Sequence, residues 1–120
     1  MANPNIVNVS AIYGQTNGMA VTTSVTALVS NSSSSGKLYK INSLVVSNVD
    51  GTNTADVTVE VYKNQSTSMY LTYTVAVPAD ASLVVISKDT SIYLNENDSL
   101  RLTASVNSDL YAVCSWDEIN

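Results

Sequence analysis

Histidine is absent from the 120-residue chain, and Cys114 is its single cysteine. The lack of histidine excludes Ser-His-Asp and Cys-His catalytic arrangements and the usual zinc sites. One cysteine cannot form an intramolecular disulfide, so the sequence gives no sign of an oxidising compartment. Cys114 would be nucleophilic only if a base lowered its pKa. It alternates in step with Leu110 and Ala112, so we expect a small buried core residue instead.

Charge is also scarce, at 12% of residues with a net charge of −5. The basic residues are scattered, whereas nucleic-acid binding needs a clustered basic surface, so we exclude that class of partner. No segment approaches the roughly 20 apolar residues of a membrane span. The N-terminal residues 1–5 lack the charged and apolar regions of a signal peptide. We therefore expect a protein made in a cytoplasm that neither enters a membrane nor is exported by that route.

Helix-forming residues are few, while Val, Ser, Thr and Asn make up half of the chain. Val and Thr favour strands, and Ser and Asn favour turns. Val57, Val59 and Val61 alternate with polar residues, which is typical of a strand with one buried face. About eight strands are predicted in this way. They cover residues 5–13, 20–30, 37–49, 55–63, 69–77, 82–87, 91–95 with 99–106, and 109–116.

Turn signals separate these segments. Asn17-Gly18 and Asp50-Gly51 are both typical of tight hairpins, and residues 95–98 form a polar turn. Evenly spaced short strands predict one all-β domain over residues 1–120, an antiparallel β-sandwich of jelly-roll or Ig-like topology. At the two ends of the chain, we expect extended arms at residues 1–8 and 117–120.

Few groups suggest chemistry. The acidic turn at 95–98 carries oxygen ligands at close spacing, as calcium sites do, but it lacks the twelve-residue loop of an EF-hand. We favour a solvated hairpin turn and expect no metal and no cofactor. No pair of carboxylates indicates glycoside hydrolysis. Tyrosines in the predicted strands, including Tyr62 and Tyr73, would suit a subunit interface or a glycan if they are exposed.

The C-terminal half resembles small virion proteins of tailed bacteriophages, particularly marine and cyanobacterial ones. The resemblance rests on residues 77–86, on Ser91-Ile92-Tyr93-Leu94, on residues 97–105 and on the ending Cys114–Ile119. Asn97 stands where that pattern usually has glycine, and Trp116 stands where it has tyrosine. Because asparagine tolerates the left-handed conformation, we expect the turn at Asn97 to be preserved.

This resemblance implies a non-enzymatic part of a phage particle, and a capsid decoration (cement) protein in particular. Such a protein would bind the major capsid protein or other virion proteins, and a homotrimer would match a local three-fold axis. A tail, neck or fibre component and a glycan-binding adhesion module are the alternatives; a small carboxylate hydrolase is the least favoured. For an interface we select both ends of the chain. The selected residues are Asn3, Pro4, Asn5, Trp116, Asp117, Glu118 and Ile119.

Overall fold

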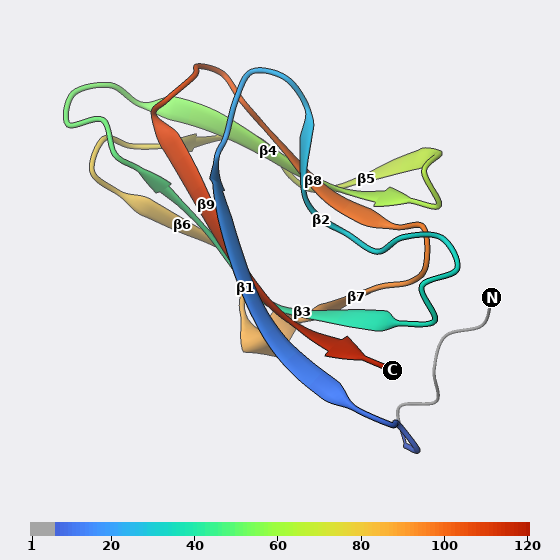
Figure 1. The fold of residues 1–120 in the computed structure, drawn as a ribbon. Helices are drawn as coiled ribbons and strands as arrows, with labels where there is room; N and C mark the ends of the chain where they lie inside the picture. Colours follow the sequence, from blue (N-terminus) through green and yellow to red (C-terminus); the bar gives the residue numbers. More distant parts are fainter. Residues whose placement is uncertain (1–6) are drawn as a thin grey trace.

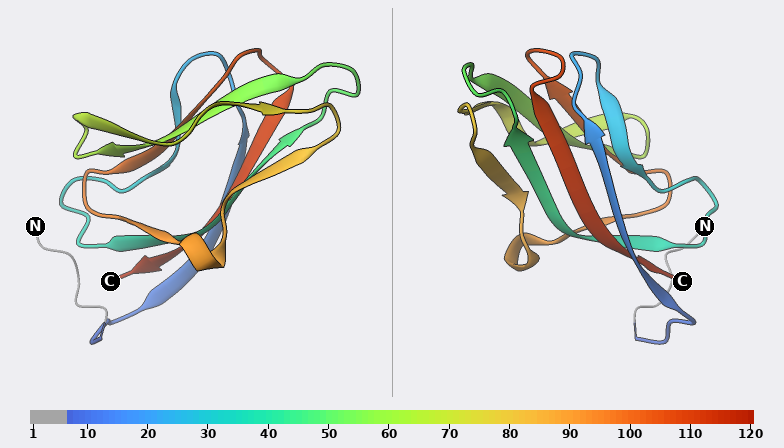
Figure 2. Two further views of the ribbon diagram at one scale, coloured as in Figure 1. Left: turned by 180° about the vertical axis from the view of Figure 1, so that it is seen from behind. Right: turned by 60° about the vertical axis from the view of Figure 1, so that its left-hand side comes forward.

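The computed structural model describes residues 7–120, which form two antiparallel β-sheets packed face to face (Figures 1 and 2). This confirms the predicted β-sandwich. The strands are β1 (Ile12–Ala20), β2 (Thr26–Ser30), β3 (Leu38–Asn48), β4 (Ala55–Lys63), β5 (Thr67–Val77), β6 (Ser82–Ile86), β7 (Ile92–Leu94), β8 (Ser99–Ala104) and β9 (Leu110–Ile119). A 3-10 turn, η1 (Lys88–Thr90), precedes β7. In this part of the chain, no helix is long and apolar enough to cross a membrane.

The strand order is that of a jelly roll. One sheet has the order β1-β9-β3-β6, with β7 also paired to β3, and the other has the order β2-β8-β4-β5. The antiparallel pairs are nested along the chain: β1 with β9, β2 with β8, β3 with β6, and β4 with β5. A long hairpin whose tip is the β4–β5 turn, rolled into two layers, gives this order. The structure thus selects the jelly roll over the Ig-like topology.

Alternating apolar residues form the core between the sheets. Val57 and Val59 on β4 are fully buried, as are Leu100 and Leu102 on the neighbouring β8. The opposing sheet contributes Leu44 and other residues of β3 and β9. Alternation buries one face of each central strand because successive side chains point to opposite sides.

Several predicted strands have different bounds, and the strand predicted over residues 20–30 is shortened to Thr26–Ser30. The first lies at Ile12–Ala20 rather than 5–13, and residues 5 and 6 fall outside the described part. The segment predicted over residues 91–106 is two strands, β7 and β8, in different sheets. The turn at 95–98 carries the chain from one layer to the other, so residues 7–120 form nine strands instead of eight.

Neither predicted hairpin turn forms. Asn17 and Gly18 lie within β1, which pairs with β9 near the far end of the chain without interruption. Asp50 and Gly51 connect β3 to β4, which belong to different sheets. Among the described glycines only Gly36 has a positive φ. The dipeptide signal was wrong because non-local pairing decided these positions.

The turn expected at Asn97 is confirmed. Its backbone has a φ of 71°, in the left-handed region that asparagine tolerates better than most residues. Asp98 then donates its N–H to the carbonyl of Asn95, at 3.1 Å, which closes the turn. The substitution of asparagine for glycine is therefore compatible with the observed backbone.

Candidate interaction surface

The C-terminal residues selected for an interface lie inside β9, between β1 and β3. Trp116 and Ile119 are only 9% and 6% exposed, while Asp117 and Glu118 are half-buried. The expected arm at 117–120 is thus wrong for residues 117–119. Two consecutive acidic residues interrupt the apolar alternation, which hid the continuation of the strand. The other selected residues, at 3–5, lie outside the described part, and the interface role of both groups stays a prediction.

The end of β9 is a packed corner of the sheet. Glu118 Oε1 lies 3.3 Å from Lys37 Nζ, and its Oε2 accepts a hydrogen bond from Trp116 Nε1 at 3.4 Å. The Trp116 ring stacks at 6.2 Å on Tyr39. Burial raises the pKa of Tyr39, the Glu118 charge raises it further, and Lys37 opposes both. These contacts join β9 to β3 and to Lys37 just before it, so the side chains stabilise the folded chain.

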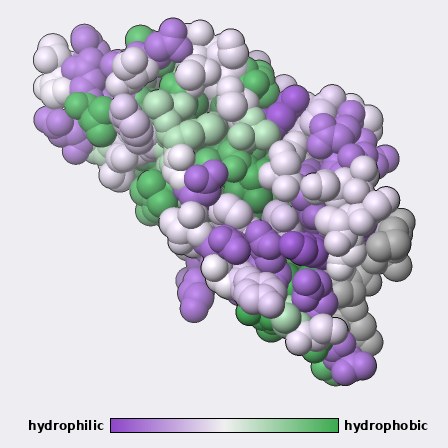
Figure 3. Space-filling model, in the orientation of Figure 1, coloured by the Kyte–Doolittle hydropathy of each residue, from purple (hydrophilic) through white to green (hydrophobic). Residues whose placement is uncertain are grey.

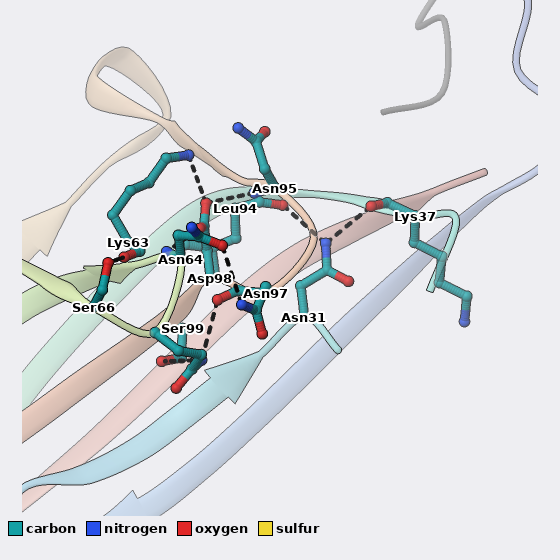
Figure 4. A network of polar contacts seen from close by, with 11 residues as sticks. Asn31, Lys37, Lys63, Asn64, Ser66, Leu94, Asn95, Asn97, Asp98 and Ser99 are labelled. Carbon is teal, nitrogen blue, oxygen red and sulfur yellow. Dashed lines mark hydrogen bonds and ion pairs between the residues drawn. The ribbon is translucent and has the colours of Figure 1, made fainter. Parts of the chain in front are cut away.

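The acidic turn at 95–98 is not the solvated hairpin turn expected from the sequence, because it joins strands of different sheets and forms a largely buried polar network (Figure 4). Asp98 is 1% exposed, and its carboxylate accepts hydrogen bonds from Lys63 Nζ at 2.7 Å and from the backbone N–H groups of Asn64 and Asn95 at 2.8 and 2.9 Å. Both carboxylate oxygens are therefore engaged within the chain. Among residues 7–120 there is no cluster of three or more His, Cys, Asp or Glu side chains able to hold a metal. The turn is the β7–β8 connection, and its Asp98 side chain ties it to the β4–β5 loop.

Asn31 extends this network to the connection between β2 and β3, where residues 32–35 are all serine. It is 1% exposed, and its Nδ2 donates to the carbonyls of Lys37 and Leu94 at 2.9 and 3.0 Å. Its Oδ1 accepts a hydrogen bond from the Ser35 hydroxyl. Buried amides need such partners because an unpaired polar group is costly. The network in Figure 4 thus fixes three connections at one end of the sandwich.

Cys114 is fully buried between the sheets, as expected. Burial raises the pKa of its thiol to about 12. A thiol with so high a pKa forms almost no thiolate at neutral pH, and the thiolate is the nucleophile. Cys114 is therefore a buried core residue, as its alternation with Leu110 and Ala112 predicted.

Aromatic side chains gather on the outer face of the β2-β8-β4-β5 sheet. Tyr70 and Tyr73 are 55% and 64% exposed, and their rings meet edge to face at 4.9 Å. Tyr62 lies beneath the Arg101 guanidinium, 3.6 Å from its Cζ. Arg101 also binds Glu60 across the strands, with Nη2 to Oε1 at 2.8 Å. Tyr62 is thus engaged by the fold, whereas the Tyr70 and Tyr73 pair faces solvent.

A small pocket of about 150 Å³ opens on the same sheet where β5 bulges. Thr74 has a φ of 47°, and its N–H donates to Thr58 Oγ1 at 3.0 Å. The lining is Asp56, Thr58, Thr74, Thr103, Ala104 and Ser105. Such a lining offers hydroxyl groups and one carboxylate, which suit a polar ligand such as water or a sugar hydroxyl.

The strands at the sheet edges carry no charged residue. Every Asp, Glu, Lys or Arg that lies in a strand belongs to the four central ones, β3, β4, β8 and β9. The edge strands β1, β2, β5 and β6, and the short β7, are uncharged. Several of their apolar residues are exposed, and Figure 3 shows hydrophobic side chains at the surface near the upper part of β1. Charges are one of the devices by which β-proteins prevent pairing between edge strands, so these edges lack that protection.

Comparison with solved structures supports the fold. A chain from the Bacillus endospore appendages, described as a novel family of disulfide-linked pili, superposes with a TM-score of 0.56 at 13% identity, over 92% of this chain and 87% of that one. A chain from the acid-stable capsid of the Helicobacter pylori bacteriophage KHP30 has a TM-score of 0.53 at 12% identity, over 94% and 90%. Such low identities show a shared fold alone. No family model and no curated protein matches the sequence.

Proposed function

We propose that the chain is a non-enzymatic structural subunit of a phage particle, a capsid decoration protein that binds capsid subunits. The observation that carries the proposal is the absence of charge from every edge strand of a sandwich that exposes apolar residues there. Large association surfaces need such uncharged, partly apolar areas. The jelly roll shared with a phage capsid chain supports the same class, although fold alone does not decide function.

The polar groups of the chain favour a structural over a catalytic role. Asp98 and Asn31 are saturated by hydrogen bonds that hold loops in place, and Cys114 is buried with a raised thiol pKa. Catalytic groups need a pKa suited to proton transfer and access to substrate. The carboxylate hydrolase, the least favoured alternative, gains no support from these contacts.

Assembly of this chain would be non-covalent. One of its structural neighbours is described as disulfide-linked, but Cys114 is 0% exposed between the two sheets. A second thiol cannot reach it without opening the core. Repeated surface contacts are then the means by which the protein would attach to a shell and to other copies of itself. The three-fold arrangement expected for a capsid axis stays a prediction.

Copy number in purified particles tests the proposal. Phage particles that carry this chain are analysed by quantitative mass spectrometry and by cryo-electron microscopy of the shell. Several hundred copies distributed over the head support the decoration role. A few copies at one vertex or along the tail would instead support the neck, tail or fibre alternative. Absence of the chain from the particle would refute a structural role in the virion.

A glycan-binding adhesion module is the second candidate. The solvent-facing pair of Tyr70 and Tyr73 favours it, because aromatic faces bind sugar rings, and the pocket beside Thr74 supplies hydroxyl groups. Binding to a glycan array that is lost in Tyr73→Ala, and retained in Tyr93→Ala on the other sheet, would favour this candidate. No binding at any concentration tested would remove it.

A further inference from the structure

The edge strand β1 differs from the other sheet edges. β2 and β6 have five residues each, and β5 is bulged at two places against β4. Bulges and short length are devices that prevent edge-to-edge pairing. β1 has nine residues, pairs with β9 in one unbroken register, and contains neither charge, proline nor positive φ. The right panel of Figure 2 shows it between β9 of its own sheet and β2 of the other sheet, and Asn17 Nδ2 donates a hydrogen bond to the Leu28 carbonyl on β2 at 3.4 Å.

Alternate backbone groups of β1 have no strand partner among residues 7–120, where β1 pairs with β9 alone. Ala11 and Asn120 exchange hydrogen bonds at 3.2 and 3.0 Å, and Val21 donates to Leu110 at 2.8 Å. Odd-numbered residues therefore bond to β9, because donor direction alternates along an antiparallel strand. The N–H and C=O groups of the even-numbered residues point to the free edge. These residues are Ile12, Gly14, Thr16, Gly18 and Ala20.

Gly14 is unexplained by the single chain. A Cβ added there would meet nothing within 4 Å, and the residue has no positive φ. Glycine in a strand weakens it and often marks a place where another backbone approaches closely. In contrast, a Cβ at Gly18 would lie 3.1 Å from the Ala112 carbonyl oxygen, so that glycine has a reason within its own sheet.

We propose that β1 pairs antiparallel with β1 of a second copy, about a two-fold axis at Thr16, and joins the two sheets into one. The central segment, Gly14-Gln15-Thr16-Asn17-Gly18, reads the same by residue class in both directions. Pairing about Thr16 sets glycine opposite glycine and amide opposite amide, and threonine pairs with itself. This register pairs all nine residues and matches even with even residues, so about ten backbone hydrogen bonds can form.

We assign a second copy of this chain as the partner of β1 because the segment is self-complementary and because the edge is neutral. The chain carries a net charge of −5, which opposes self-association unless the contact itself is uncharged. Tyr13 would lie opposite Met19, a favourable aromatic–sulfur pair. The inference is independent of the virion role, because it concerns the purified chain alone, and it competes with the homotrimer that the resemblance implies.

The mass of the purified chain in solution tests the pairing. Light scattering after size exclusion should give two chains for the wild type and one for Thr16→Pro. The Thr16 N–H faces the free edge, so proline blocks the new ladder and spares the β9 ladder. Thr16→Val keeps the N–H and should remain dimeric. If circular dichroism shows that Thr16→Pro does not fold, Thr16→Lys replaces it. Its charge on the edge should likewise give a single chain in solution.

Crosslinking gives an independent readout of the register. Facing Thr16 residues would have Cα atoms about 5.5 Å apart, within disulfide range. Oxidised Thr16→Cys should therefore yield a covalent dimer at high fraction, whereas Thr52→Cys, on an exposed loop, should not. The buried Cys114 should not interfere. A monomeric wild type at all concentrations, a trimer, or a dimer that Thr16→Pro and Thr16→Lys leave intact would each overturn the proposal.

Discussion

Removing the Asp98 carboxylate should destabilise the fold more than removing any surface charge. In Asp98→Ala, the backbone N–H groups of Asn64 and Asn95 lose their acceptor in a part-buried site. Each buried donor left unpaired costs about 1–3 kcal/mol. Lys63 Nζ also loses its partner, but its side chain is 39% exposed and can be hydrated. We expect a loss of about 2–4 kcal/mol in the free energy of unfolding.

Urea denaturation followed by tryptophan fluorescence measures this loss. A slope of about 2 kcal/mol per molar urea converts it to a midpoint shift of about 1–2 M. Lys63→Met is the matched comparison, because it breaks the same ion pair and keeps both backbone hydrogen bonds to Asp98. It should cost less than half as much. Asp89→Ala, on the exposed η1 turn, should be neutral. If Asp98→Ala is no more harmful than Lys63→Met, then the backbone hydrogen bonds do not carry the stabilisation.

Three further predictions concern the thiol, the core and the turn. Because burial raises its pKa to about 12, Cys114 should resist a thiol reagent at pH 8 in the native state and react at once in denaturant. Leu100→Ala removes a fully buried side chain and should cost about 2–5 kcal/mol by urea denaturation, whereas Val84→Ala on an exposed position should cost under about 1 kcal/mol. At Asn97, where φ is 71°, Asn97→Gly should be nearly neutral and Asn97→Ala should lower the melting temperature, since alanine disfavours that conformation.

The layers of this fold were predictable from the sequence because they follow local rules. Period-two alternation located the central strands well, and the β4 prediction of residues 55–63 matches the observed bounds. The edge strand β1 was missed, since its nine residues are nearly all exposed and show no apolar alternation. Asn17-Gly18 then looked like a turn. Its extended form depends on β9, which lies about a hundred residues further along the chain and is invisible to local patterns.

The interaction surface was less predictable than the fold. Selecting the chain ends followed from their polar composition, but Trp116 and Ile119 belong to the core. The signal that would have helped is the absence of charge from particular strands. It has meaning only once the strand order shows which strands are edges, and no pattern within one strand carries that order.

The nested pairing of the jelly roll explains how charge is distributed. β1 and β9 form the open end of the rolled hairpin. Within the sheet, β9 pairs with β1 on one side and with β3 on the other. A charge in β9, such as Glu118, can therefore be matched locally by Lys37 and does not prevent pairing. A charge in β1 would stand on the open edge and repel its equivalent in a second copy. A chain selected only to stay monomeric gains from a lysine at Thr16 or Gly14, and this chain has none at any edge. The neutral edge of β1 is thus what the proposed pairing of two copies predicts.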